Sequence, residues 1–191
     1  MNIGIFSGSF NPIHIGHLIL ANYITEYSAL DEVWLLVTPQ SPLKDGKILL
    51  DEKIRLEMTN LAIKDYPKIK ISDIEFSLPR PSYTVNTLHE LKNKYPEHSF
   101  SLILGADNWE IFEFWKDYED ILEEYKIYVY PRYGYSVSTP SRYKKKVEVL
   151  DSPIVEISST FIREGLKEGK DLRSFMPEIV YKYIKDHNLY Q

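Results

Sequence analysis

The sequence predicts an α/β fold in which helices cover both faces of a doubly wound, mostly parallel sheet. Short apolar runs bounded by turn residues recur along the chain, as in buried strands. Between them, apolar residues return at helical spacing. Regular alternation of strand and helix favours right-handed crossovers, and such sheets bind ligands beyond the carboxyl ends of their strands.

Five apolar runs are the predicted strands, at residues 3–6, 33–37, 69–71, 101–104 and 127–130. Apolar stripes predict a helix that carries Leu18, Ala21 and Ile24, and further helices over residues 51–66 and 84–95. We expect Ser82 or Thr84 to cap the last of these. Residues 39–47 and 132–146 are predicted loops.

Composition limits the class of protein. The chain has 191 residues and a formal net charge of -5, which fits one domain over residues 1–191 and argues against broad nucleic-acid binding. It has no cysteine, hence no disulfide or thiolate site. No apolar run is long enough for a membrane span, and the N-terminus lacks a signal peptide. We therefore expect a soluble, cytoplasmic protein with no nucleic-acid or membrane partner.

The turn after the first predicted strand carries two histidines, His14 and His17, three residues apart. A strand-to-helix turn directs unpaired N–H groups and the helix dipole at one point, which favours a bound anion. Gly8 and Gly16 allow close backbone approach, and Pro12 stiffens the turn. Structural histidines at a helix cap are the alternative, but the glycine and proline frame favours a phosphate site.

A second polar group lies near the end of the chain, where Ser158, Ser159 and Thr160 precede Arg163. Ser159 and Arg163 are four residues apart and share a helical face. No Glu or Gln follows three residues after any of the hydroxyls, so this is no capping box. Three hydroxyls and a guanidinium form a suitable clamp for an oxyanion.

These two segments resemble the motifs of the nucleotidyltransferase superfamily, G-x-F-x-P-x-H-x-G-H and I-S-S-T-x-I-R. Nearly the whole chain is similar to the bacterial nicotinate-nucleotide adenylyltransferase family. The resemblance implies a Rossmann-like nucleotidyltransferase fold. It also implies adenylyl transfer from ATP to nicotinate mononucleotide in NAD biosynthesis, with Mg²⁺ arriving on ATP and no metal ligands from the protein.

The resemblance carries site residues over to this chain in three groups. The expected catalytic residues are His14, His17, Lys44, Ser158 and Arg163. The expected ATP-binding residues are Gly8, Ser9, Phe10, Gly16, Gly105, Asp107, Ile157 and Ser159. The expected residues for nicotinate mononucleotide are Tyr83, Thr84, Trp115, Lys116 and Arg132.

Three positions depart from the family pattern. Leu43 stands where a histidine often precedes the loop lysine, Asn86 replaces an aspartate, and Arg132 follows Pro131 where the family usually has the reverse order. Near Trp115, the aromatic residues Phe112 and Phe114 are expected in the core.

Other functions remain open from the sequence. A pantetheine-phosphate adenylyltransferase or a cytidylyltransferase would share the first motif, and a non-catalytic nucleotide-binding protein would share the fold. A tRNA synthetase fragment fits least, because no KMSKS element is present. The sequence does not decide between a monomer and a homo-oligomer.

Overall fold

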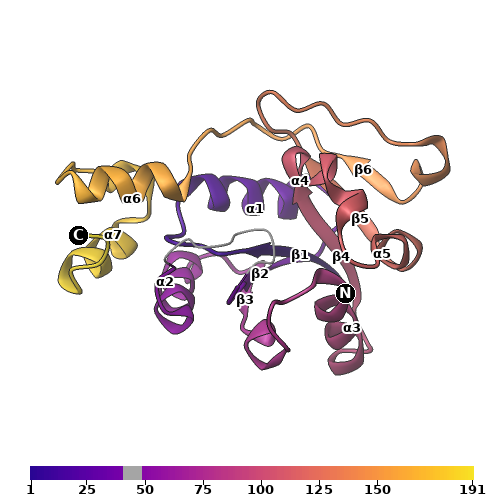
Figure 1. Ribbon diagram of the computed structural model, residues 1–191, viewed down its shortest axis with the longest axis horizontal. Helices are drawn as coiled ribbons and strands as arrows, with labels where there is room; N and C mark the ends of the chain where they lie inside the picture. Colours follow the sequence, from indigo (N-terminus) through magenta and orange to yellow (C-terminus); the bar gives the residue numbers. More distant parts are fainter. Residues whose placement is uncertain (41–48) are drawn as a thin grey trace.

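The computed structural model describes residues 1–40 and 49–191 and contains a parallel sheet of six strands in the order β3-β2-β1-β4-β5-β6 (Figure 1). The predicted doubly wound α/β fold is confirmed. The strands are β1 (Asn2–Gly8), β2 (Glu32–Val37), β3 (Ile69–Ser72), β4 (Ser99–Gly105), β5 (Lys126–Tyr130) and β6 (Val147–Val149).

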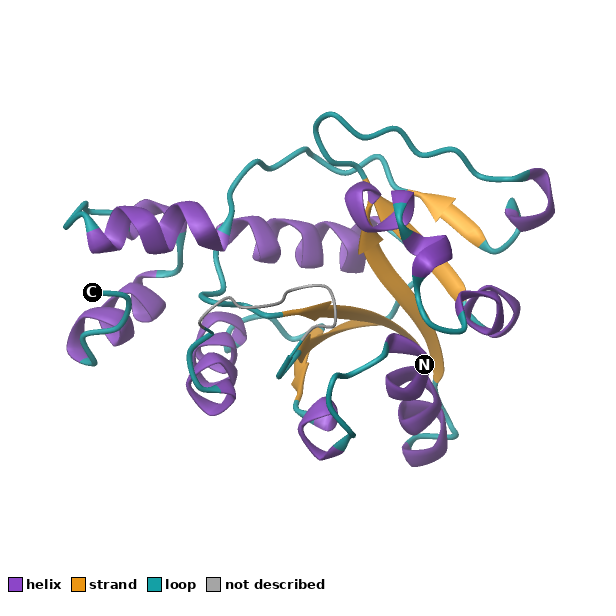
Figure 2. Cartoon of the chain, in the orientation of Figure 1, coloured by secondary structure: helices purple, strands orange, loops and turns teal. Residues whose placement is uncertain are grey.

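Helices connect the strands and extend beyond the last one (Figure 2). They are α1 (Ile15–Tyr27), α2 (Glu52–Ile63), α3 (Thr84–Lys94), α4 (Ala106–Glu110), α5 (Tyr118–Glu124), α6 (Ser159–Lys167) and α7 (Glu178–Asp186). Short 3₁₀ turns include η1 (Ile74–Ser77) and η2 (Phe112–Phe114). The C-terminal helix α7 packs against α2 at one end of the molecule (Figure 1).

Both faces of the sheet are buried, which explains why its strands are almost continuously apolar. Side chains alternate along each strand: Ile3 and Ile5 of β1 pack with α3 and α5, whereas Phe6 packs with α1, α2 and the C-terminal helices. The two hydrophobic clusters so formed hold the sheet rigidly between its helices.

The strand order creates the position for a ligand. The chain moves outward from β1 to β2 and β3, then returns to place β4 on the other side of β1. The carboxyl ends of β1 and β4, at Gly8 and Gly105, therefore lie at a topological switch point. Open parallel sheets bind ligands in the crevice at such a point.

Three local features differ from the interpretation of the sequence. Strand β6 was not predicted, because three residues are too few to give a periodic signal. Tyr83, not Ser82 or Thr84, is the N-cap of α3, and its side chain makes no capping hydrogen bond. Phe114 is 86% exposed, because the turn η2 directs it outward while Phe112 is buried.

Candidate functional site

A cavity of about 530 Å³ lies at the switch point, within the usual size of small-molecule sites. It brings together residues from both ends of the chain and from the middle. The predicted site residues that line it are Gly8, Ser9, Phe10, His14, His17, Tyr83, Thr84, Gly105, Asp107, Trp115, Lys116, Arg132, Ile157, Ser158, Ser159 and Arg163. Gly16 does not line it, and Lys44 lies outside the described residues.

Glycines let the turn between β1 and α1 close tightly. A Cβ on Gly16 would lie 3.0 Å from His14 Nδ1 and 3.3 Å from Val155, so any side chain there would displace the His14 ring. A Cβ on Gly8 would approach the Phe10 ring to 2.9 Å. Gly16 thus acts by leaving room for His14 and not by contacting the ligand.

The two histidine rings are stacked with their centroids 3.7 Å apart. His14 is the N-cap of α1, and its backbone N–H donates to His17 Nδ1 at 3.2 Å. Because Nδ1 of His17 accepts this bond, the neutral imidazole carries its proton on Nε2. Burial, and then the nearby charge of Arg132, lower the pKa of His14 to about 4, so His14 is neutral at physiological pH.

Helix α6 is tied to the β1–α1 turn across almost the whole sequence. Ser159 Oγ donates to the Pro12 carbonyl at 2.9 Å, and Arg163 Nη1 donates to the Asn11 carbonyl at 2.8 Å. Ser158 caps α6 by accepting a hydrogen bond from the Phe161 N–H at 3.1 Å. The structure therefore joins the two sequence motifs in one wall of the cavity.

The end of β4 supplies a carboxylate beside an arginine. Asp107 Oδ1 lies 3.7 Å from Arg132 Nε, and neither atom makes a hydrogen bond to any residue that the structure describes. Arg132 Nη2 donates to Tyr130 Oη at 3.2 Å, which orients the guanidinium. A Cβ on Gly105 would overlap the Asp107 carboxylate, so the glycine allows this carboxylate to fold back toward the strand.

The opposite side of the cavity combines an aromatic wall with a helix N-terminus. Trp115 packs on Phe112 with ring centroids 5.3 Å apart, and its buried Nε1 has no hydrogen-bond partner within residues 1–40 and 49–191. Lys116 Nζ lies 4.9 Å from the centre of the Tyr83 ring. Since Tyr83 leaves the start of α3 without a side-chain cap and Thr84 lines the cavity, this end can bind an anion.

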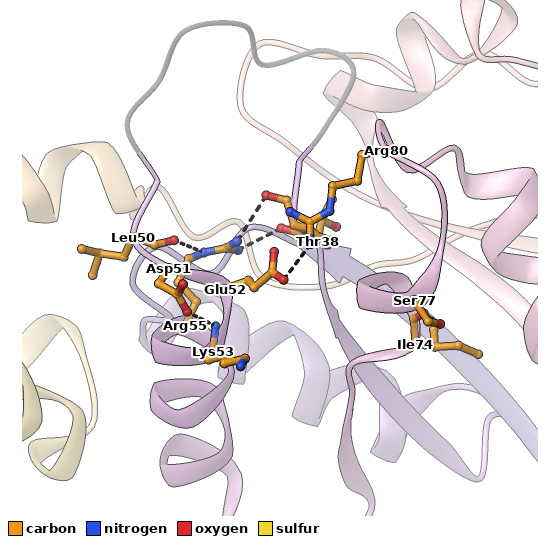
Figure 3. Close-up of polar contacts among 10 residues, drawn as sticks. Thr38, Leu50, Asp51, Glu52, Lys53, Arg55, Ile74, Ser77 and Arg80 are labelled. Atoms are coloured by element: carbon orange, nitrogen blue, oxygen red, sulfur yellow. Dashed lines mark hydrogen bonds and ion pairs between the residues drawn. The ribbon is translucent and has the colours of Figure 1, made fainter.

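Sequence reasoning missed Arg55 of α2, whose side chain is only 1% exposed (Figure 3). Among the described residues, its guanidinium pairs with no carboxylate and binds backbone carbonyls instead. The acceptors are Ser9 at 2.6 Å, Thr38 and Leu50 at 2.9 Å, and Pro39 at 3.3 Å. Arg55 thus joins the ends of β1 and β2 to the start of α2. No sequence signal distinguishes it from the exposed arginines of a helix.

Sequence reasoning also missed Glu75 of η1, which lines the cavity although it is only 3% exposed. Thr87 Oγ1 donates to Glu75 Oε1 at 3.3 Å. Burial raises the pKa of Glu75 to about 7, while the nearby hydroxyls of Thr87, Thr38 and Ser82 act in the opposite direction. Glu75 is thus a carboxyl group in the wall of the site whose pKa lies near neutral pH.

Within residues 1–40 and 49–191, no three His, Cys, Asp or Glu side chains are grouped as metal ligands would be. None of the helices in the same residues is both long and apolar enough to cross a membrane.

The strand order and the cavity are those expected of the nucleotidyltransferase class. A family model described as Cytidylyltransferase-like matches residues 5–165, and the chain belongs to this family. Its relatives include two bacterial proteins, each named "Probable nicotinate-nucleotide adenylyltransferase". The Bacteroides fragilis protein is 57% identical over 95% of this chain and 90% of its own length. The Flavobacterium johnsoniae protein is 52% identical over the full length of both.

Solved structures confirm the fold. The nicotinic acid mononucleotide adenylyltransferase of Plasmodium falciparum, complexed with NaAD, superposes with a TM-score of 0.80. It is 22% identical to this chain, and the match covers 99% of this chain and 97% of that one. The same enzyme complexed with APC gives a TM-score of 0.79.

Proposed function

We propose that this protein is an enzyme that transfers the adenylyl group of ATP to nicotinate mononucleotide, giving deamido-NAD and pyrophosphate. The observation that carries the proposal is the cavity at the β1–β4 switch point, which unites both phosphate motifs with a helix N-terminus. Relatives of about half identity over the full chain bear the name of this activity.

The chemistry requires alignment and charge neutralisation more than a covalent intermediate. A phosphate oxygen of nicotinate mononucleotide forms a bond to the α-phosphorus of ATP. The bond from that phosphorus to the bridging oxygen breaks, and pyrophosphate leaves with the electron pair. Donors held in place before the reaction stabilise the charge that develops on the bridging oxygen. We assign this role to His14, His17, Lys44, Ser158 and Arg163.

The two substrates are proposed to occupy opposite sides of the cavity. Gly8, Ser9, Phe10, Gly105, Asp107, Ile157 and Ser159 form the ATP side, and Gly16 supports it by leaving room for His14. Tyr83, Thr84, Trp115 and Lys116 form the pyridine side, and Arg132 is proposed to contact nicotinate mononucleotide from its place beside Asp107. On the pyridine side, the uncapped start of α3 and the charge of Lys116 favour a carboxylate over a neutral amide.

Mg²⁺ is proposed to bind with the phosphates of ATP, because the described residues offer no grouped ligands for it. Bound there, it would neutralise phosphate charge. We propose that the reaction takes place in the cytoplasm and involves no nucleic acid.

Pyrophosphate release tests the assignment. ATP and Mg²⁺ are supplied with nicotinate mononucleotide, nicotinamide mononucleotide or phosphopantetheine, each alone. We expect release with nicotinate mononucleotide to exceed the other two by far. Release with phosphopantetheine alone would keep the fold and change the acceptor. No release with any acceptor would indicate a non-catalytic nucleotide-binding protein.

A further inference from the structure

Glu75 occupies a position that the reaction as described does not use. It lies on η1, which packs against β2 and α3, and its side chain lines the cavity while 97% of it is shielded from solvent. Among the described residues, its buried Oε2 atom has no hydrogen-bond partner of good geometry. A buried, unpartnered carboxyl oxygen in a cavity wall calls for a ligand or a functional explanation.

The surroundings of Glu75 disfavour its charged form. Hydroxyl groups face it from both packed elements: Thr38 follows β2, and Ser82 and Thr87 lie at the start of α3. Among the described residues, no charged side chain is a cause of this shift. The Arg55 guanidinium is directed at backbone carbonyls. Burial without a cation keeps a carboxyl group protonated to higher pH.

Thr87 connects Glu75 to the start of α3. Thr87 lies in the first turn of that helix, and its hydroxyl contacts both Glu75 Oε1 and the Tyr83 carbonyl, each at 3.3 Å. Tyr83 is the N-cap of the same helix. Glu75 therefore lies behind the end of the helix where the pyridine carboxylate is proposed to bind.

We propose that Glu75 is a specificity-determining residue of the pyridine side, which accepts an anionic pyridine substituent while protonated and repels it once ionised. The proposal rests on the function proposed above. Its consequence is that the preference for nicotinate over nicotinamide mononucleotide weakens as the pH rises. The pKa of about 7 for Glu75 places this change near neutral pH.

The test compares the natural chain with the Glu75→Gln variant from pH 6 to pH 9. The KM for nicotinate mononucleotide and the inhibition constant of nicotinamide mononucleotide are measured at each pH. Both ligands carry the same phosphate and pyridinium, so the ratio of the two constants reports only the effect of the carboxylate. We expect the KM for nicotinate mononucleotide to rise about fivefold relative to the amide constant in the natural chain. In Glu75→Gln the ratio of the two constants should not change with pH.

Thr87→Val provides a second variant that retains the carboxyl group. The Thr87 hydroxyl stabilises the ionised form of Glu75, so its removal raises the pKa of Glu75 further. The rise in KM should then begin at a higher pH than in the natural chain. This shift is measurable even if Glu75→Gln fails to fold, and a purely structural role would not produce it.

The outcomes separate the two proposals. No turnover of nicotinate mononucleotide at any pH would overturn the proposed function itself. Turnover with the same pH-dependent ratio in the natural chain and the Gln variant would overturn only the role of Glu75. A KM for nicotinate mononucleotide that falls as the pH rises would also overturn it, because the carboxylate would then stabilise the positive pyridinium ring.

Discussion

At the scale of single residues, the site depends on polar atoms that the protein positions but does not fully satisfy. In the part of the chain that the structure describes, neither Trp115 Nε1 nor Asp107 Oδ1 has a hydrogen-bond partner, and both atoms are buried. Buried polar atoms are nearly always paired in folded proteins, so a group of unpaired ones in one cavity indicates where a ligand completes the bonding.

His17→Ala should lower kcat by about 100-fold or more and change the KM for ATP much less. The reason is that a donor directed at developing charge acts mainly in the transition state. Steady-state kinetics at saturating nicotinate mononucleotide measure both constants. His89→Ala, a change at a half-exposed histidine of α3 that does not line the cavity, serves as the control. A defect confined to ATP affinity would contradict the role of His17.

Trp115→Ala should raise the KM for nicotinate mononucleotide more than the KM for ATP, since the ring forms part of the pyridine wall. Trp115→Phe retains one aromatic ring and removes Nε1–H together with part of the indole surface. An intermediate KM for this variant would assign part of the effect to the aromatic ring that it keeps. If ATP alone were affected in the alanine variant, Trp115 would belong to the other side of the cavity.

At the scale of elements, the site is formed by the ends of strands and the starts of helices, held together by long-range hydrogen bonds. Arg163 binds the Asn11 carbonyl, and Tyr190 Oη donates to Asn11 Oδ1 at 2.7 Å. Arg55 holds the Ser9 carbonyl from the other side. The β1–α1 turn is thus fixed by α2, α6 and the C-terminal segment together.

Arg55→Met should leave several buried carbonyls without a donor, at a cost of about 1–3 kcal/mol each. We expect a clear loss of thermal stability and a loss of kcat of about tenfold or more, because the β1–α1 turn loses its support. Arg55→Lys keeps the charge but cannot form the fork of bonds, and should recover little.

Arg80→Met is the matched control for Arg55. Arg80 lies in the same region and pairs with Glu52 at 2.7 Å, yet its side chain is 47% exposed (Figure 3). Thermal melts and kinetics should show little change for this variant. Equal losses in the two arginine variants would show that burial and carbonyl binding do not explain the importance of Arg55.

Whether a feature could be predicted from the sequence depends on how far apart in the chain the interacting residues lie. Residues 8–17 and 157–163 were identified because their chemistry depends on local spacing, and the cavity contains both segments. Arg55 and Glu75 were missed because their role depends on partners such as Ser9 and Thr87, which lie 46 and 12 positions away. Phe114 was misplaced because periodicity does not describe a 3₁₀ turn.

At the scale of the whole molecule, two buried ionisable groups in one cavity make the free energy of unfolding depend on pH with opposite signs. The pKa of His14 is lowered to about 4 by burial, and that of Glu75 is raised to about 7 by the same cause. Both side chains are therefore favoured in their neutral forms in the folded state. Burial keeps these two side chains neutral, so the free energy of unfolding depends on pH through both of them.

The signs of these two contributions lead to a final prediction. His14 has a lower pKa folded than unfolded, so its contribution is lost as the pH falls from 6.5 to about 4. Glu75 has a higher pKa folded than unfolded, so its contribution is lost as the pH rises from 4.5 to about 7. Between pH 4.5 and 6.5 the two groups therefore change the free energy of unfolding in opposite directions as the pH changes. Over its full titration range, each group changes it by about 3 kcal/mol.

Urea unfolding at several pH values between 4 and 8 should separate the two slopes. In Glu75→Gln the opposing slope is removed, so the free energy of unfolding should fall more steeply on acidification than in the natural chain. In His14→Gln it should instead decline as the pH rises from 4.5 to 7. The natural chain should vary least within the overlapping window, because each neutral group there compensates for the other. Three parallel curves would show that neither side chain is held neutral by burial, and would remove the physical basis for the role assigned to Glu75 in substrate choice.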